Sequence, residues 1–298
     1  MRTLDIIITH IVSQLSFKYI HLSDYLHSFA CSPDLDMTFQ LWKDHVSKPE
    51  NKGSPWYEPW QFYLSGSKEI LLKELEIIWD FLRSGGGILC INDPRYPYLL
   101  KQIKDPPIIL FYRGNPLLFE FPAISLVGSR KAAPEALRES RDLGKALVEE
   151  GAVVVSGGAL GCDTYAHLGA LSVEGLGATI VVMAGAVDSL FPKRNRQLFS
   201  SVLERGGLII SERLPRTSPK PHDFPIRNRI ISGLSSRSII MQAAERSGAM
   251  ATANLALAQG RDVWVYDCGQ SDVRFKGNDI LIESGAPSFT ASKEYFSL

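Results

Sequence analysis

From Pro122 onward, short apolar runs alternate with longer amphipathic stretches. Six runs of five or six residues, rich in β-branched side chains, predict strands at residues 123–127, 152–156, 178–183, 207–211, 237–241 and 262–266. Pro134 and Gly151 are typical of the start and end of one intervening helix, and Ser247 and Gly260 of another. This rhythm predicts the α/β class, with a Rossmann-like, doubly wound and mostly parallel sheet covered by helices on both faces.

The N-terminal third of the chain lacks this rhythm. It shows short helical stretches and one clear amphipathic helix over residues 68–83, which glycines 85–87 end. The apolar run Ile88 to Ile91 and a short strand at Ile108 to Tyr112 flank a connector that contains four prolines. We therefore expect a smaller, mainly helical N-terminal domain with its connector over residues 1–104, and the Rossmann-like domain over residues 105–298.

The composition is that of a globular protein, and it does not indicate a binding partner. The 298 residues are 45% hydrophobic and 21% charged, which excludes disordered and fibrous chains. Lys plus Arg and Asp plus Glu are both 32, so only local clustering can indicate a polyanion. Four cysteines without a CxxC pair, no signal peptide and no apolar run of about 20 residues favour a cytoplasmic protein without membrane contact. We expect neither a metal nor a cofactor.

Glycine-containing segments follow several of the predicted strands. The first strand is followed by Gly128-Ser129-Arg130, the second by the run from Gly157 to Gly161, the third by Ala184-Gly185-Ala186 and the fifth by the run from Ala244 to Gly248. Ligands of open parallel sheets bind outside the carboxyl ends of the strands, where backbone N–H groups favour anions. Any one of these turns can simply pack a strand on a helix. Their repetition favours a phosphate-containing ligand.

The motifs of common enzymes on this fold are absent from the sequence. There is no GxxxxGK[ST] loop, and no GxGxxG follows the first strand with an acidic residue about 20 positions further on. Cys162 and His167 are five residues apart on a predicted helix and therefore point in different directions. We interpret Cys162 as a small buried hydrophobe and His167 as a structural or surface residue. No catalytic residue is predicted, and we expect a protein that is not an enzyme.

One segment of this neutral chain is strongly basic. Residues 193–246 hold eleven basic and four acidic residues, a net charge of +7, and Arg outnumbers Lys, which suits contacts to phosphate. Phe191, Phe199 and Phe224 are interleaved with these charges, and an exposed aromatic ring can stack on a nucleic-acid base. Core packing is the alternative for each ring, and it is favoured for Phe199 in an amphipathic helix. Phe224 is the strongest candidate for exposure.

Four stretches now carry a resemblance to a known family. LVGSRKAAPEA, VVSGGALGCDTYAHLGAL, LFPKRNRQLF and DFPIRNRIISGLSSRSIIMQAAERSGAMATANLALAQGRDVW resemble the DNA-processing protein A family (DprA, or Smf) in order and spacing. The likeness covers roughly residues 85–285. It implies a Rossmann-like, dimeric protein without enzymatic activity that binds single-stranded DNA and loads the RecA recombinase in natural transformation. Single-strand-binding protein is a further candidate partner.

The resemblance also implies which residues contact DNA. Transferred to this sequence, the expected nucleic-acid-binding residues are Gly128, Ser129, Arg130, Ser156, Gly157, Lys193, Asn195, Phe224, Arg227, Asn228 and Arg246. Glu245, Ser247 and Gly248 are expected to support the same edge. We expect the backbone N–H groups of the glycine turns to hold one or two phosphates, and Arg130, Lys193 and Arg227 to neutralise their neighbours.

Departures from the family pattern leave other functions open. Leu160 stands where relatives more often carry a basic residue, and the stretch after the sixth strand has lost most of the usual glycines and serines. A nucleoside-monophosphate phosphoribohydrolase and a nucleotide-binding sensor on the same fold remain alternatives. The dimer surface is also open, with apolar residues of NRQLFSSVLERG and of the helix at 247–259 as candidates.

Overall fold

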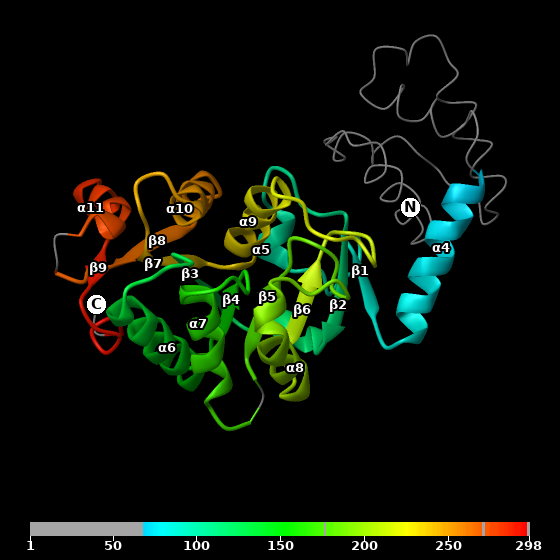
Figure 1. The fold of residues 1–298 in the computed structure, drawn as a ribbon, viewed down its shortest axis with the longest axis horizontal. Helices are drawn as coiled ribbons and strands as arrows, with labels where there is room; N and C mark the ends of the chain where they lie inside the picture. The colour runs from blue at the N-terminus through cyan, green and yellow to red at the C-terminus, as the bar shows by residue number, and fades with distance from the viewer. Residues whose placement is uncertain (1–67, 176, 270–271, 297–298) are drawn as a thin grey trace, which may run out of the picture.

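The computed structural model describes residues 68–298 except 176, 270–271 and 297–298 (Figure 1). The amphipathic helix predicted at residues 68–83 is confirmed as α4 (Lys68–Arg83). No helix within the described residues is long and apolar enough to cross a membrane. Most of the expected N-terminal domain lies outside the described residues.

One nine-stranded sheet organises the described part of the chain. Its strands are β1 (Gly87–Cys90), β2 (Ile109–Gly114), β3 (Ala123–Gly128), β4 (Val153–Ser156), β5 (Thr179–Val182), β6 (Leu208–Ser211), β7 (Arg237–Gln242), β8 (Asp262–Tyr266) and β9 (Ser288–Phe289). Their order in the sheet is β1-β2-β6-β5-β4-β3-β7-β8-β9, and every pair from β6 to β9 is parallel. All six strands predicted after Pro122 are confirmed, and so is the Rossmann-like α/β class.

Helices cover both faces of the sheet, as Figure 1 shows. One face carries α6 (Pro134–Glu149), α7 (Cys162–Leu171) and α8 (Arg196–Glu204), and the other carries α5 (Tyr98–Lys101), α9 (Asp223–Leu234), α10 (Gly248–Ala258) and α11 (Lys276–Glu283). The described residues also form short 3-10 helices, which are η2 (Pro116–Glu120), η3 (Lys193–Asn195) and η4 (Val273–Phe275). Because alternate strand residues face opposite sides, two apolar clusters form, one under each layer of helices.

The predicted helix ends are confirmed by their capping geometry. Pro134 is the first residue of α6, and Gly151 just beyond its end adopts a left-handed φ of 82°. The hydroxyl of Ser247 accepts a hydrogen bond from Met250 N at 3.3 Å and so caps α10. These caps fix where each helix starts relative to the strand before it, and therefore where the site residues lie.

The sheet continues across the expected domain boundary between residues 104 and 105. Strand β1 lies before that boundary, yet it pairs antiparallel with β2, which pairs antiparallel with β6. Arg261, just ahead of β8, strengthens the join, because its Nη2 donates to the carbonyl oxygen of Leu99 at 2.8 Å. The connector is therefore part of the same packed unit as the sheet. The division of the whole chain into two domains stays a prediction.

Candidate nucleic-acid interface

The loops after β3, β4 and β5 meet the first turns of α9 at the carboxyl edge of the sheet. Arg130 follows β3, Gly157 follows β4, and Lys193 lies in η3 after β5, while Arg227 comes from α9. These three strands are neighbours in the sheet, so their carboxyl ends bring the loops together. The structure thus gathers residues separated by about a hundred positions in the sequence.

Arg227 lies inside this edge rather than on it. Its side chain is buried, and Nη1 donates to the carbonyl oxygens of Gly157, at 2.9 Å, and of Val182. Burial lowers the pKa of Arg227 to about 10, against the opposing effect of Asp163, so the guanidinium is charged at neutral pH. Arg130 lies over the ring of Phe224, three residues before Arg227 in α9, so both arginines are on the same side of the molecule, and the charge of Arg130 lowers this pKa further. Arg227 therefore holds the β4 and β5 loops together.

Asp163, which was not among the residues predicted from the sequence, supplies a buried negative charge that acts on Arg227. It lies in the first turn of α7 with 6% of its surface exposed, and Oδ2 accepts from Ala159 N at 3.2 Å. Burial raises the pKa of this carboxyl, while the charge of Arg227 and hydrogen bonds from the N–H groups of Ala159, Gly128 and Gly157 oppose that rise. Asp163 thus lies close to these glycine turns, and the holding of DNA phosphates by the N–H groups of Gly128 and Gly157 stays a prediction.

Three further predicted contact residues hold the loops from within. Nδ2 of Asn195 donates to Gly158 O and to Thr164 Oγ1, both at 2.9 Å. The hydroxyl of Ser156 donates to Leu126 O at 2.6 Å, and Asn228 Nδ2 donates to Gly248 O at 3.4 Å. All three side chains are buried. Their hydrogen bonds fix the conformation of the loops at this edge, and other residues form its outward surface.

We call the outward surface the basic rim. It consists of the exposed cations Arg130, Lys193, Arg194 and Arg246 together with Phe191 and Phe224. The four cations form no ion pair with another described residue. Ser129 lies beside them, and its hydroxyl oxygen accepts from Lys131 N at 3.2 Å. The rim therefore offers positive charge to solvent.

Two phenylalanines in edge-to-face contact lie within the basic rim. The Cζ atom of Arg130 lies 5.2 Å from the ring centroid of Phe224, and the Phe191 ring packs edge-on against Phe224 at 5.8 Å. Phe224, the ring expected to be most exposed, is half-buried by these contacts, whereas Phe191 is 44% exposed. Phe199 is fully buried in α8, as predicted. Phe191 is therefore the ring open to a stacking partner.

The net charge of residues 193–246 exceeds the charge that the rim presents. Arg213 pairs with Asp223, and Arg229 with Glu212, both within the segment. Two more arginines find carboxylates outside it, since Arg216 lies near Asp80 and Arg237 near Asp262. Much of the positive charge is thus neutralised by the fold, and of this segment Lys193, Arg194 and Arg246 belong to the basic rim.

The interpretation of Cys162 and His167 as structural residues is confirmed. Cys162 is buried, and burial raises its pKa to about 12, so the thiolate that a nucleophile needs is disfavoured. His167 is also buried, with Nδ1 2.7 Å from the hydroxyl of Thr179, which itself donates to Val154 O. Because the Thr179 hydroxyl proton is used in that bond, Nδ1 of His167 carries a proton and donates it to Thr179 Oγ1. Among the described residues, no cluster of three or more His, Cys, Asp or Glu side chains could hold a metal.

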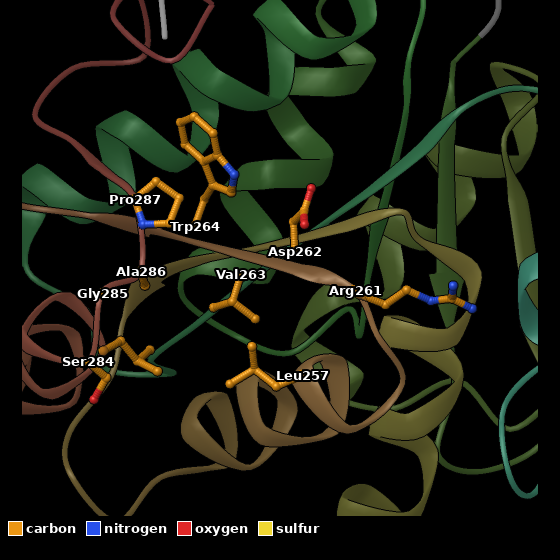
Figure 2. A pocket seen from close by; sticks show the side chains of 10 residues that line it. Leu257, Arg261, Asp262, Val263, Trp264, Ser284, Gly285, Ala286 and Pro287 are labelled. Carbon is orange, nitrogen blue, oxygen red and sulfur yellow. The ribbon is translucent and has the colours of Figure 1, made fainter.

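A separate pocket of about 270 Å³ lies at the opposite edge of the sheet. Figure 2 shows it between the end of α10, at Leu257, the start of β8, at Arg261 to Trp264, and the segment from Ser284 to Pro287. Because β8 begins at Asp262, this pocket is at the amino edge, away from the basic rim. None of the predicted DNA-contacting residues lines it.

Fold and site together define a doubly wound α/β protein with a basic, aromatic rim at the carboxyl edge of its sheet. Residues 87–298 match the family described as DNA recombination-mediator protein A. The chain belongs to this family. The resemblance to DprA and Smf proteins is thereby confirmed.

Curated relatives and solved structures agree with this assignment. The DNA processing protein DprA of Bacillus subtilis is 36% identical over 221 residues, which cover 74% of this chain and 73% of the relative. The structure of DprA from Streptococcus pneumoniae matches with a TM-score of 0.80 at 28% identity, covering 100% of this chain and 98% of that one. DprA from Helicobacter pylori, described for its single-stranded DNA binding mode, matches with a TM-score of 0.64 at 29% identity, covering 71% and 94%.

Proposed function

We propose that this protein binds single-stranded DNA along the basic rim and acts as a recombination mediator that loads RecA in natural transformation. The observation that carries the proposal is the contact of Arg130 with Phe224, flanked by the exposed ring of Phe191 and by Lys193. Cations beside stackable rings are what an unpaired strand needs. The single-stranded DNA binding mode described for the Helicobacter pylori relative supports the same ligand.

In this proposal, one group of residues contacts DNA and a second group supports it. Arg130, Lys193 and Arg194 contact phosphates from outside, and Phe191 stacks on a base. Arg227, Asp163 and Asn195 hold the loops that carry those side chains. Phosphate and stacking contacts read little base identity, so binding is weakly sequence-specific and falls with salt at a slope of about −0.7 per phosphate. Duplex DNA binds less well because its bases are already stacked.

We also propose that the protein acts without catalysis. The nucleotide sensor and the phosphoribohydrolase both need to enclose a mononucleotide, and the pocket of about 270 Å³ lies at the amino edge of the sheet, away from the glycine turns. Cys162 and His167, the candidate nucleophile and base, are both buried and pack in the interior. Incubation with nucleoside monophosphates is expected to release no base.

We further propose an oligomeric state, a location and protein partners. The protein works in the cytoplasm as a homodimer, with RecA and single-strand-binding protein as partners. Of the two apolar stripes named from the sequence, that of α8 is buried in the chain's own core, whereas α10 leaves Leu257 exposed. Light scattering of the purified protein tests the dimer. RecA filament formation on DNA coated with single-strand-binding protein tests the loading activity.

The decisive test of DNA binding is a double variant of the rim, Arg130→Ala with Lys193→Ala. Each lost charged contact is worth about 1.5–3 kcal/mol, so affinity for oligo-dT at about 50 mM salt is expected to fall tenfold or more. The matched control is Lys145→Ala with Arg205→Ala, which removes two exposed cations near the ends of α6 and α8, at the opposite edge. Equal affinity in both double variants would contradict the proposal.

A further inference from the structure

The connector between β1 and β2 returns to the edge of the sheet where the basic rim lies. Because β2 is antiparallel to both β1 and β6, the chain leaves β1 at Cys90 and enters β2 at Ile109 at the carboxyl edge of the parallel strands. In between, α5 packs beside α9 (Figure 1). Nε of Arg229 in α9 donates to the carbonyl oxygen of Asp105 at 3.0 Å, so the last part of the connector lies against the helix that begins at the rim.

Four side chains around this connector form a surface that we call the connector surface. It consists of Tyr98 and Lys101 of α5, of Lys104 just beyond it, and of Arg261 ahead of β8. Tyr98 is 73% exposed, and both lysines are exposed as well. Residues three apart lie on the same face of a helix, which brings Tyr98 and Lys101 together. Nη2 of Arg261 donates to the carbonyl oxygen of Leu99 at 2.8 Å, so this guanidinium lies beside α5.

The positive charge of the connector surface is not balanced by neighbouring carboxylates. The two carboxylates of the connector and the one next to Arg261 each have another cationic partner. The pairs are Arg95–Asp93 at 2.8 Å, Arg229–Asp105 at 3.3 Å and Arg237–Asp262 at 3.8 Å. Within the residues that the structure describes, the three cations of the connector surface form no ion pair. Positive charge and an exposed aromatic ring are thus available together, which is the combination that favours an unpaired strand.

The connector surface continues the basic rim along α9. That helix carries Phe224 of the rim in its first turn and Arg229 five residues further on. At 1.5 Å per residue, these two positions are about 8 Å apart along the helix axis. Lys104 precedes the residue that accepts from Arg229, so the connector surface starts about one and a half helical turns from the rim. A strand that leaves the rim beside Phe224 therefore meets Lys104 first, and Lys101 and Tyr98 after it.

We infer that the connector surface is a second contact surface for the single-stranded DNA that the basic rim holds. Lys101 and Lys104 neutralise phosphates there, and Tyr98 stacks on a base. The inference rests on the proposed function and extends the bound strand onto a segment that holds none of the contact residues predicted from the sequence. An acidic protein is the other ligand that suits such a surface, and the continuity with the rim favours DNA.

Two oligonucleotide lengths test this extension of the site. A single binding fold covers about 4–16 nucleotides, so oligo-dT of about 8 nucleotides fills the rim alone and oligo-dT of about 30 reaches the connector surface. For Lys101→Ala with Lys104→Ala, we expect affinity for the long strand to fall about tenfold or more and affinity for the short strand to stay within about twofold. The slope of log affinity against log salt should shrink by about 1.4 for the long strand, since each phosphate contributes about 0.7. Lys145→Ala with Arg205→Ala is the matched control.

Cross-linking locates the contact directly. Irradiation of the complex with oligo-dT that carries 5-iododeoxyuridine is expected to attach the long strand, and not the short one, to Tyr98, with the peptide identified by mass spectrometry. Absence of that cross-link, or equal affinity and salt slope in the lysine variant and its control, overturns the inference. Weaker RecA loading with unchanged DNA affinity overturns it too, because the surface would then bind protein.

Failure of the proposed function would give a different result. The wild type would then bind neither strand, or the rim variant Arg130→Ala with Lys193→Ala would bind both strands as the wild type does. If the inference alone fails, the wild type binds both strands, the rim variant binds both weakly, and the lysine variant of the connector surface matches its control.

Discussion

Gly157 and the guanidinium of Arg227 occupy adjoining space: a Cβ atom at residue 157 would lie 2.5 Å from Nη2 of Arg227. We therefore expect Gly157→Ala to displace Arg227 and to lower the free energy of unfolding by about 1–3 kcal/mol, the usual cost of overpacking. Denaturant titration measures the loss. Gly248→Ala is the control, because a Cβ there meets nothing within 4 Å, and a variant pair with equal stability would show that the close approach is unimportant.

Arg227→Ala and Arg130→Ala are expected to behave in opposite ways. Removing Arg227 leaves the carboxylate of Asp163 buried without its countercharge, so the free energy of unfolding falls by about 3–5 kcal/mol. Removing the exposed Arg130 changes stability by about 0.5 kcal/mol or less and weakens binding to oligo-dT. Thermal unfolding and gel-shift titration of the two variants separate the roles. Comparable stability of both variants would refute the internal role of Arg227.

Phe191→Ala tests the stacking surface. Base stacking on an aromatic ring is worth about 1–3 kcal/mol, so affinity for single-stranded DNA is expected to fall by roughly 5- to 150-fold. Phe191→Trp is expected to keep affinity. Phe199→Ala is the contrasting variant: its ring is fully buried, and its loss costs about 3–5 kcal/mol of stability. If Phe191→Ala binds abasic and dT oligonucleotides with the same ratio as the wild type, stacking is not its role.

His167 makes stability depend on pH. Burial, with a smaller effect of Arg227, lowers its pKa to about 3, against about 6.5 in the unfolded chain. Below pH 6.5 the unfolded chain takes up a proton that the folded protein refuses. Stability is therefore complete above pH 6.5 and is lost as pH falls toward 3, by at most about 5 kcal/mol over that window.

The variant His167→Gln removes this titration, so its stability between pH 6.5 and 4 should fall less steeply than that of the wild type. Leu171→Ala, a buried truncation in the same helix that removes no ionisable group, should keep the wild-type slope. Urea titrations at closely spaced pH values measure both slopes. A wild-type slope in His167→Gln would assign the acid sensitivity to other groups.

The fold was predictable because its signals are local. Strand-length apolar runs, Pro134 at a helix start and Ser247 at a helix cap each act within a few residues, and the structure has each where the pattern predicts it. The addition of β1 and β2 to one edge of the sheet could not be predicted in the same way, because it depends on pairing between distant segments. Such pairing leaves no periodic signal in a single sequence.

The site was predictable in location but only partly in the role of each residue. The strand ends placed Arg130 and Lys193 correctly at one edge. The direction of the Arg227 side chain could not be read, because its acceptor Val182 lies 45 positions away. Asp163 gave one usable signal, an acidic residue at the start of a predicted helix after a glycine turn, and that position favours a carboxylate facing backbone N–H groups.

The pairing of β1 with β2 has a practical consequence for cutting the chain. A fragment that starts at residue 105 keeps β2 but loses the strand that covers it, which leaves a row of unmatched backbone donors and acceptors open to other molecules. Such a fragment is prone to aggregate through the exposed edge of β2. A fragment that starts just ahead of Gly87 keeps the cover in place and is the better choice for preparing the DNA-processing core by itself.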